Sequence, residues 1–290
     1  MNAPLMQVWG CRGGRNTRDS RIGNSTSSYS VAVGADLFVF DAGRGLGALG
    51  AALTSDERLR GVARLHVLIT HAHMDHWEGL KDAEWMWRRD NGLELTVFGP
   101  HEALATIAAA HQPPGFVALD VLAMGTLARL SFVALTAGSK VTLPGATLET
   151  VALHHYSGVD PHRRHLDTLG YRLAIDGGPT VAYLSDHEPT AATRAMEDAV
   201  VAAAQLVIVD ANHSDVAQHT FGHGSIEYAA DLARRHPRTR VLAGHHGPLQ
   251  TDRLIEDAFA RHAAGCANVA LAVEGAAETW DPVAARFVRQ

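Results

Sequence analysis

Residues 68–80 read Leu-Ile-Thr-His-Ala-His-Met-Asp-His-Trp-Glu-Gly-Leu, and this stretch decides how the rest of the chain is interpreted. Its polar members follow an apolar run directly and are His71, His73, Asp75 and His76. Imidazole nitrogens and carboxylate oxygens are ligands that zinc, iron and manganese take in proteins. Four such groups within six positions are rare in an ordinary solvated loop. The stretch therefore predicts a metal-binding loop at the end of a buried strand.

The composition fits a globular protein with a sizeable core. The chain has 290 residues, of which 47% are hydrophobic and 19% charged, and we expect residues 1–290 to form a single domain. A net charge of −6 does not call for a nucleic-acid partner. Two cysteines, Cys11 and Cys266, are too few for a disulfide framework. The N-terminal residues lack the pattern of a secretion signal and no apolar run is long enough to cross a membrane, so we expect a cytoplasmic protein without a membrane partner.

Short apolar runs alternate with turn signals and helical patterns along the chain, which predicts an α/β fold with two layers of sheet and helices outside them. The expected strands are Ser28–Val33, Leu37–Phe40, Leu65–Ile69, Leu93–Phe98, Leu130–Leu135, Thr147–Leu153, Gly170–Ile175, Thr180–Leu184, Leu206–Val209 and Arg240–Ala243. The expected helices are Gly45–Leu53, Leu80–Arg89, Glu102–Ala110, Pro189–Gln205, a helix capped by Ser225 that runs to His236, and Asp252–Ala263.

Histidine or aspartate also follows four other predicted strands. These residues are Asp41, the pair His154-His155, Asp186, and the pair His245-His246. Strand ends are rigid and the loops beside them are accessible, so functional residues commonly gather there. A lone aspartate such as Asp41 is usually a turn residue. Together with the histidine loop, however, the five clusters favour a metal site built from several strand ends.

Two metal ions would explain so many ligands. In dinuclear hydrolases the two ions lie roughly 3.5–4 Å apart and hold both the entering and the leaving oxygen. A bound metal lowers the pKa of water from about 15.7 to about 7, which supplies a hydroxide nucleophile at neutral pH without serine or cysteine. The absence of a Gly-x-Ser-x-Gly motif agrees with this interpretation.

The sequence Thr-His-Ala-His-Met-Asp-His at 70–76, followed by later His, Asp and His, resembles the ligand signature of the metallo-β-lactamase fold superfamily. This resemblance implies a four-layer αββα sandwich, in which two mixed sheets are flanked by helices. It implies two divalent cations, with zinc expected and manganese or iron as alternatives. It assigns His71, His73 and His155 to the first metal, Asp75, His76 and His245 to the second, Asp186 to both, and Asp41 to a supporting position. His154 and His246 remain alternatives to their neighbours.

Four further segments resemble the phosphodiesterase-like branch of that superfamily, which includes ribonuclease Z and the phosphoribosyl cyclic phosphodiesterases. They are residues 8–14 (VWGCRGG), 23–31 (GNSTSSYSV), 40–50 (FDAGRGLGALG) and 221–233 (FGHGSIEYAADLA). This resemblance implies that His223 assists phosphoryl chemistry, with Asp75 as the other catalytic residue. The sequence departs from the branch in having Gly-His-Gly-Ser in place of Gly-His-Ser-Thr, and no insertion matches the tRNA-binding arm of ribonuclease Z, so the substrate does not transfer.

The expected function is that of a dinuclear metal-dependent hydrolase, namely a phosphodiesterase acting on a small-molecule or nucleotide-like phosphodiester through a metal-bridging hydroxide. An acyl hydrolase of lactonase, thioesterase or β-lactamase type is the alternative on the same fold, ahead of a di-iron redox protein or a binding module. Candidates for substrate contact are Trp77, Arg163 and Arg164, with residues 85–89 as a further pocket wall. A homodimer is compatible with the sequence.

Overall fold

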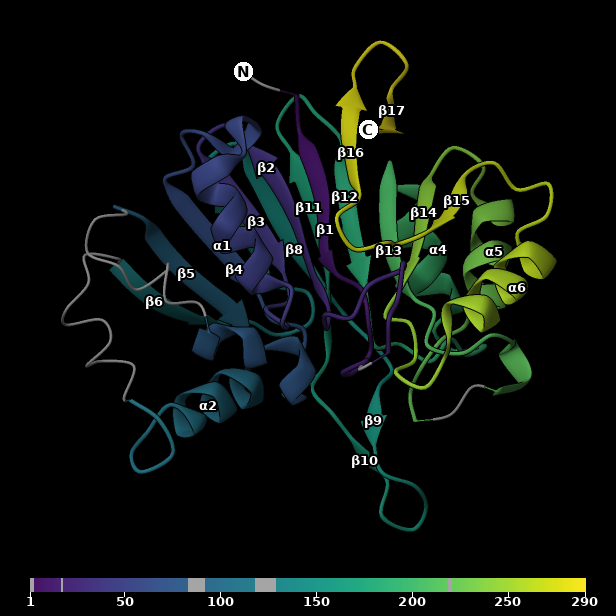
Figure 1. The fold of residues 1–290 in the computed structure, drawn as a ribbon, viewed down its shortest axis with the longest axis horizontal. Helices are drawn as coiled ribbons and strands as arrows, with labels where there is room; N and C mark the ends of the chain where they lie inside the picture. Colours follow the sequence, from purple (N-terminus) through teal and green to yellow (C-terminus); the bar gives the residue numbers. More distant parts are fainter. Residues whose placement is uncertain (1–2, 17, 83–91, 118–128, 219–220) are drawn as a thin grey trace.

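The computed structural model describes residues 3–16, 18–82, 92–117, 129–218 and 221–290. Two large mixed sheets pack face to face, and the described helices lie on their outer faces (Figure 1). This arrangement confirms the α/β sandwich. The described α-helices are α1 (Leu46–Ser55), α2 (His101–Ala110), α4 (Arg194–Ala202), α5 (Ile226–Arg235) and α6 (Asp252–His262). None of the helices in the described part of the chain has the length and apolar character that a membrane crossing requires.

The first sheet has the strand order β17-β16-β1-β2-β3-β4-β5-β6. Its strands are β1 (Leu5–Gly10), β2 (Ser28–Val33), β3 (Asp36–Phe40), β4 (Arg64–Leu68), β5 (Glu94–Gly99), β6 (Arg129–Ala134), β16 (Ala277–Asp281) and β17 (Arg286–Arg289). Strands β3 to β6 run parallel, and the remaining neighbours pair antiparallel. Helices α1 and α2 bury their apolar residues against the outer face of this sheet.

The second sheet has the order β15-β14-β13-β12-β11-β8-β7. Its strands are β7 (Lys140–Leu143), β8 (Ala146–Ala152), β11 (Leu169–Ile175), β12 (Thr180–Leu184), β13 (Leu206–Asp210), β14 (Arg240–Gly244) and β15 (Val269–Leu271). Strands β12 to β15 are parallel, and α4, α5 and α6 cover their outer face. A separate hairpin of β9 (Tyr156–Ser157) and β10 (Arg164–His165) projects from the same end as α2 (Figure 1).

The core between the sheets explains why the strands read as continuous apolar runs. Every residue of β1, β3 and β13 is buried, because each of these strands has one face on the other sheet and one face under helices or loops. One apolar cluster joins the inner faces of both sheets to α4, α5 and α6, and a second cluster lies beneath α1 and α2. The two sheets therefore hold their strand ends in fixed relative positions.

Most predicted elements are present, with two corrections. The helix expected over Pro189–Gln205 forms only at Arg194–Ala202, because the hydroxyl groups of Thr190 and Thr193 bond to each other's backbone N–H and form a turn instead. Strands β1, β7, β9, β10, β15, β16 and β17 were not predicted. The helix expected over Leu80–Arg89 lies mostly outside the described residues, and residues 78–82 form a 3-10 helix.

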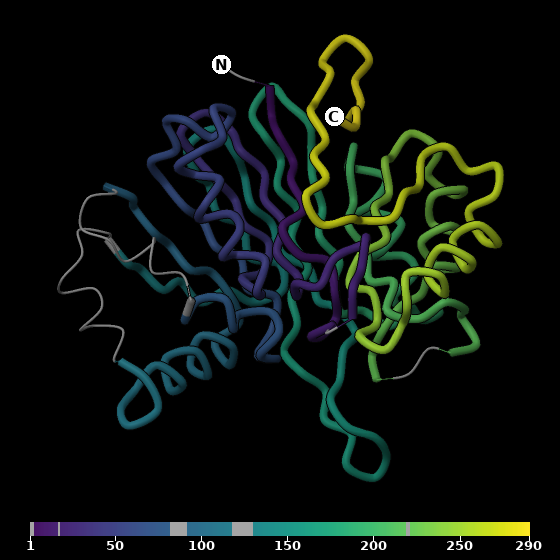
Figure 2. Tube along the Cα trace, viewed as in Figure 1, coloured from purple at the N-terminus to yellow at the C-terminus, as the bar shows by residue number. Residues whose placement is uncertain are grey.

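The topology places five loops at one edge of the sandwich. The parallel strands β3, β4, β12, β13 and β14 end on the same side, which is where open α/β sheets present their ligand sites. The Cα trace shows the loops that follow these strands converging between the two sheets (Figure 2). The predicted metal residues lie in these loops, except His155, which follows β8.

Candidate metal centre

The histidine loop leaves the end of β4 and folds back within a single turn. Residues Met74–His76 form a 3-10 helix that places His76 inward, and the backbone N–H of His76 donates to the carbonyl of His73. The indole N–H of Trp77 donates to the carbonyl of Ala72 at 2.9 Å. These bonds hold the four polar side chains of the loop on its inner side.

A first cluster of possible metal ligands joins the histidine loop to the second sheet. Its members are His71, His73, His155 and Asp186, whose ligand atoms all lie within 4.8 Å of one another. The Nε2 of His155 is 3.2 Å from Nδ1 of His73. The Oδ2 of Asp186 is 3.7 Å from Nε2 of His71 and 3.6 Å from Nε2 of His155. Nitrogen and oxygen atoms of this set face a common point.

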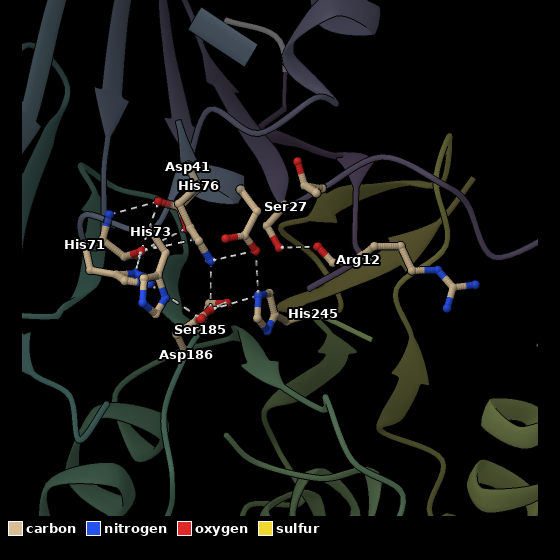
Figure 3. A network of polar contacts seen from close by, with 12 residues as sticks. Arg12, Ser27, Asp41, His71, His73, His76, Ser185, Asp186 and His245 are labelled. Atoms are coloured by element: carbon tan, nitrogen blue, oxygen red, sulfur yellow. Dashed lines mark hydrogen bonds and ion pairs between the residues drawn. The ribbon is translucent and has the colours of Figure 1, made fainter. Parts of the chain in front are cut away.

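A second cluster lies beside the first and contains Asp75, His76 and His245. The Oδ2 of Asp75 is 3.5 Å from Nε2 of His76 and 3.6 Å from Nε2 of His245. The other oxygen of Asp186, Oδ1, is 3.2 Å from Nε2 of His76 and 3.1 Å from Nε2 of His245. Asp186 thus directs one oxygen to each cluster, as Figure 3 shows from close by.

The backbone at three of these strand ends is unusual. Asp41, Asp186 and His245 have φ angles of 56°, 54° and 55°. A non-glycine residue in this left-handed region costs about 1–3 kcal/mol, and such residues concentrate at functional sites. The conformation turns each side chain back into the space between the sheets, so the surrounding fold holds these residues where the clusters meet.

The donor atoms have the chemistry of a metal site. Among the described residues, Nε2 of His71, His76 and His245 is buried and has no hydrogen-bond partner, and an orphaned buried nitrogen requires an explanation. Divalent cations bound in the two clusters would satisfy all three. Burial lowers the pKa of His71 well below its ordinary value, so this imidazole is neutral and able to bind a cation. Burial also opposes charge on His76, but the carboxylates of Asp186, Asp41 and Asp75 outweigh it and raise the pKa of His76.

Asp41 supports the second cluster from behind. Its buried Oδ2 is 2.6 Å from Nδ1 of His76 and accepts a 2.8 Å hydrogen bond from the hydroxyl of Tyr183. Its Oδ1 accepts a 2.8 Å bond from the backbone N–H of Thr70. A carboxylate on the far nitrogen of a metal-binding imidazole fixes the orientation of the ring. The position expected for Asp41 agrees with this geometry.

His223 lies beside both clusters and is held by a residue that the sequence analysis missed. Its Nδ1 is 2.8 Å from Oδ2 of Asp210 and 3.9 Å from Oδ2 of Asp186, and its ring is 5.0 Å from the ring of His155. Burial opposes protonation, but the neighbouring Asp210 carboxylate raises the pKa of His223. Asp210 follows the apolar run of β13 just as Asp41 and Asp186 follow theirs, so the same signal would have found it.

The glycines beside His223 are required by close packing. A Cβ on Gly222 would lie 2.6 Å from Nδ1 of His155, and its φ is +78°, whereas a Cβ on Gly224 would lie 2.6 Å from the carbonyl oxygen of Asp210. The carbonyl of Gly222 also accepts a 2.8 Å hydrogen bond from Nδ1 of His155. Ser225 then caps α5 by accepting from the N–H of Tyr228, as predicted. The Gly-His-Gly-Ser motif thus fixes His223 at the entrance to a helix.

The two members of each pair of adjacent histidines have different contacts in the structure. His155 and His245 lie in the clusters. Their neighbours have other partners. Nδ1 of His154 lies 3.3 Å from the carbonyl of Glu188, and Nε2 of the buried His246 lies 3.2 Å from the carbonyl of Ala272. His154 and His246 therefore stabilise the loops around the site, and the geometry favours His155 and His245 as ligands.

The residues proposed to contact substrate have other contacts. Trp77 is buried in the core beneath α1 and α2, so its indole packs behind the histidine loop and does not form an open wall. Arg163 stacks over the ring of Tyr156, 4.2 Å from its centroid, and Arg164 forms an ion pair with Glu102 at the start of α2. Both arginines lie in or beside the β9–β10 hairpin. Residues 85–89 lie outside the described part of the chain.

Comparisons with known proteins agree with this fold. A family model described as "Beta-lactamase superfamily domain" matches residues 37–246. No sequence among curated proteins matches the chain significantly. Solved structures with the same fold include zinc-bound PqqB from Methylobacterium extorquens, with 18% identity and a TM-score of 0.66 over 94% of this chain and 99% of that one. A diphosphatase of the PhnP family has 15% identity and a TM-score of 0.66 over 94% and 96% of the two chains. The short form of human tRNase Z has 16% identity and a TM-score of 0.60 over 94% and 98%.

Proposed function

This chain belongs to the beta-lactamase superfamily, and we propose that it is a dinuclear metal-dependent hydrolase that cleaves phosphodiester bonds. The fold family consists largely of metal-dependent hydrolases, and its structural neighbours include a diphosphatase and a tRNase. The observation that carries the dinuclear part of the proposal is the position of Asp186, whose two oxygens face two separate histidine clusters.

In this proposal the first cation is held by His71, His73 and His155, the second by Asp75, His76 and His245, and Asp186 contacts both. Three of the imidazoles have buried, unpartnered Nε2 atoms, which bound cations would satisfy once any proton on these nitrogens is released. Zinc suits this set of imidazole and carboxylate donors, and manganese and iron suit it as well. When bound, such cations supply a water that ionises near neutral pH and positive charge for the oxygens of the substrate.

His223 favours phosphoryl chemistry over acyl chemistry. Its Nδ1 is engaged by Asp210, so Nε2 is the nitrogen available to the substrate. It precedes the N-terminus of α5, where the helix dipole favours an anion, while the first N–H groups of the helix donate to His213, Ser214 and Ser225. A protonated imidazole at that place can contact a phosphoryl oxygen and donate its proton to the leaving oxygen. Hydrolysis of a lactone or thioester has less need of a second cationic donor on this side.

The test combines metal analysis with a panel of substrates. The purified protein is assayed for bound metal and then for turnover of bis(p-nitrophenyl) phosphate, a cyclic nucleotide, a lactone and nitrocefin. We expect about two metal ions per chain and turnover of the phosphodiesters. Turnover of the lactone or nitrocefin alone would replace the phosphodiesterase by an acyl hydrolase. A protein that neither contains nor rebinds metal would contradict the whole proposal.

The role of His223 is tested separately with His223→Ala, and His101→Ala serves as the control because His101 is exposed on α2. We expect His223→Ala to lower kcat for a phosphodiester by about 10²–10⁴-fold, the usual contribution of a general acid, with unchanged metal content. The control should stay within about twofold of the wild type. Unchanged phosphodiester turnover in His223→Ala would contradict the acid role and leave the metal proposal intact.

A further inference from the structure

A groove lined by arginines lies at the opposite end of the second sheet from the metal centre. We call it the arginine groove, and its lining consists of residues 205, 233–234, 237–240, 265–268 and 286–289. Its volume is about 670 Å³, which is in the usual range for small-molecule sites. Arg240 begins β14 and His245 follows its end, so at about 3.3 Å per residue the groove lies roughly 16 Å from the second metal cluster.

Positive charge in the groove is largely uncompensated. Its lining includes five arginines: Arg234, Arg238, Arg240, Arg286 and Arg289. Arg240 is paired with the buried Glu278 at 2.9 Å, but the other four are exposed and have no carboxylate partner within the described part of the chain. No aspartate or glutamate occurs among the lining residues. This concentration is unexpected in a chain whose net charge is −6.

Two sources of negative potential beside the groove are neutralised by the protein itself. The carboxylate of Glu278 accepts hydrogen bonds from the guanidinium group of Arg240. The C-terminal end of α5 would repel an anion through its free carbonyls. The side-chain amide of Asn268, however, donates to the carbonyls of Ala233, His236 and Thr239 at 2.8–3.1 Å. The fold thereby removes two sources of negative potential, and Asp281, opposite Arg286 in the β16–β17 pairing, accepts hydrogen bonds from the N–H groups of Val283 and Ala284.

We propose that the arginine groove binds a small oligophosphate ligand. The planar guanidinium group binds phosphate oxygens through paired N–H donors. The four arginines without a carboxylate partner come from three chain segments, namely the end of α5, the turn that follows it, and β17, and all four line this one groove. An extended nucleic acid would need a continuous basic track, and the net negative charge of the whole chain opposes it. This site is independent of the proposed hydrolase activity.

Cys266 provides a local probe of the groove. Its thiol is half-buried in the lining, whereas the other cysteine, Cys11, is fully buried and burial raises its pKa to about 12. A neutral alkylating reagent such as iodoacetamide should therefore modify Cys266 selectively. We expect sodium tripolyphosphate to slow this alkylation at least about fivefold at 0.15 M salt, and sodium sulfate at equal ionic strength to slow it less than about twofold.

The charge requirement is tested with the double variant Arg238→Gln/Arg286→Gln. The matched control is Arg60→Gln/Arg253→Gln, which removes the same charge from two exposed sites elsewhere. We expect the first variant to weaken tripolyphosphate binding about tenfold or more, and the control less than about twofold. Binding is followed both by calorimetry and by protection of Cys266.

Four outcomes would overturn the proposal. The first is equal loss of binding in the two double variants, and the second is tripolyphosphate binding without protection of Cys266. The third is protection by a 20-nucleotide single strand but not by tripolyphosphate, which would make the groove a nucleic-acid site. Protection that persists in His245→Ala supports the proposal, because it separates the groove from the metal centre. Loss of protection in His245→Ala would place the anion at the metal centre instead.

Discussion

Strands β3 and β4 carry a buried aspartate–histidine pair at each end, and the two pairs differ in what surrounds them. At the start of the strands, Nε2 of His66 is 2.9 Å from Oδ1 of Asp36. At their end, Nδ1 of His76 is 2.6 Å from Oδ2 of Asp41. The pairs share one chemistry, one sheet and nearly complete burial. Only the pair at the end of the strands belongs to a candidate functional site.

The contacts of the first pair, Asp36 and His66, come from residues of its own sheet. Arg64 donates two hydrogen bonds to Asp36, at 2.7 and 2.6 Å, which satisfies both oxygens of the carboxylate. The ring of His66 stacks on Phe38, with centroids 4.8 Å apart. No second carboxylate contacts this histidine in the described residues. The pair therefore joins two strands and does nothing more.

The second pair is open toward the other sheet. The free Nε2 of His76 is 3.2 Å from Asp186 and 3.5 Å from Asp75. Asp186 comes from the end of β12, and His245 from the end of β14. Of these two aspartate–histidine pairs, only the one that lies where the ends of parallel strands from both sheets meet belongs to the candidate metal centre. The difference between the two pairs can be tested by removing one carboxylate at a time.

The largest effect is expected from Asp186→Asn, which keeps the size of the side chain and removes the charge that faces both clusters. We expect loss of at least one metal ion per chain and a decrease in kcat/KM of about 10³-fold or more, since metal catalysis supplies several kcal/mol of transition-state stabilisation. Metal analysis and phosphodiester kinetics measure the two quantities. A variant that retains both metal ions and near-normal turnover would contradict the bridging position.

A second prediction compares the neighbours His245 and His246. We expect His245→Ala to lower metal content and to reduce activity by about 10²-fold or more, because it removes a ligand of the second cation. His246→Ala should retain metal and activity but lose about 1–3 kcal/mol of stability, because His246 is fully buried in the core. Metal content and urea unfolding distinguish the two. If His246→Ala lost metal and His245→Ala did not, the ligand assignment would be reversed.

A smaller effect is expected from Asp41→Asn. Asp41 touches no cation in the proposed site, but it orients His76 through Nδ1. Loss of such a partner typically weakens metal affinity by about 10–100-fold. Competition with a fluorescent zinc chelator measures this change, and added zinc should restore most of the activity. Activity that zinc cannot restore would show that Asp41 acts in some other way.

The contiguous half of the site was predictable from the sequence, whereas the other half required the fold. His71, His73, Asp75 and His76 lie in one short loop, so their spacing alone identifies them. Asp186 and Asp41 follow from the rule that strand ends carry sites. Asp210 obeys the same rule, but an aspartate after a strand is most often a turn residue, and nothing in the sequence placed it beside His223.

Other features could not be decided before the sheets were seen. One member of each histidine pair faces the site. The alternation of side chains along a strand does not decide which member it is, because His245 leaves the extended conformation with a φ of 55°. The direction of the Trp77 side chain also depends on the fold. Its place after the histidine loop suggested a pocket wall, whereas its indole packs inward beneath α1. The pairing of β1 with the distant β16 likewise has no local signal.

The smallest effect on catalysis is expected from Asp36→Asn, which removes the carboxylate of the first pair. Metal content and kcat/KM should stay within about twofold of the wild type, while the free energy of unfolding falls by about 1–3 kcal/mol because Arg64 and His66 lose a charged partner.

Burial raises the pKa of Asp36, but the hydrogen bonds from Arg64 and His66 outweigh burial and hold the pKa below its ordinary value. The stabilisation is therefore fully present above the ordinary aspartate pKa of about 3.9 and is lost as the pH falls through the lower folded-state pKa. Urea unfolding of wild type and variant at pH 6 and pH 3 should show the difference between them shrinking at the lower pH. A difference independent of pH, or a loss of metal in Asp36→Asn, would mean that the two pairs are not as distinct as their surroundings indicate.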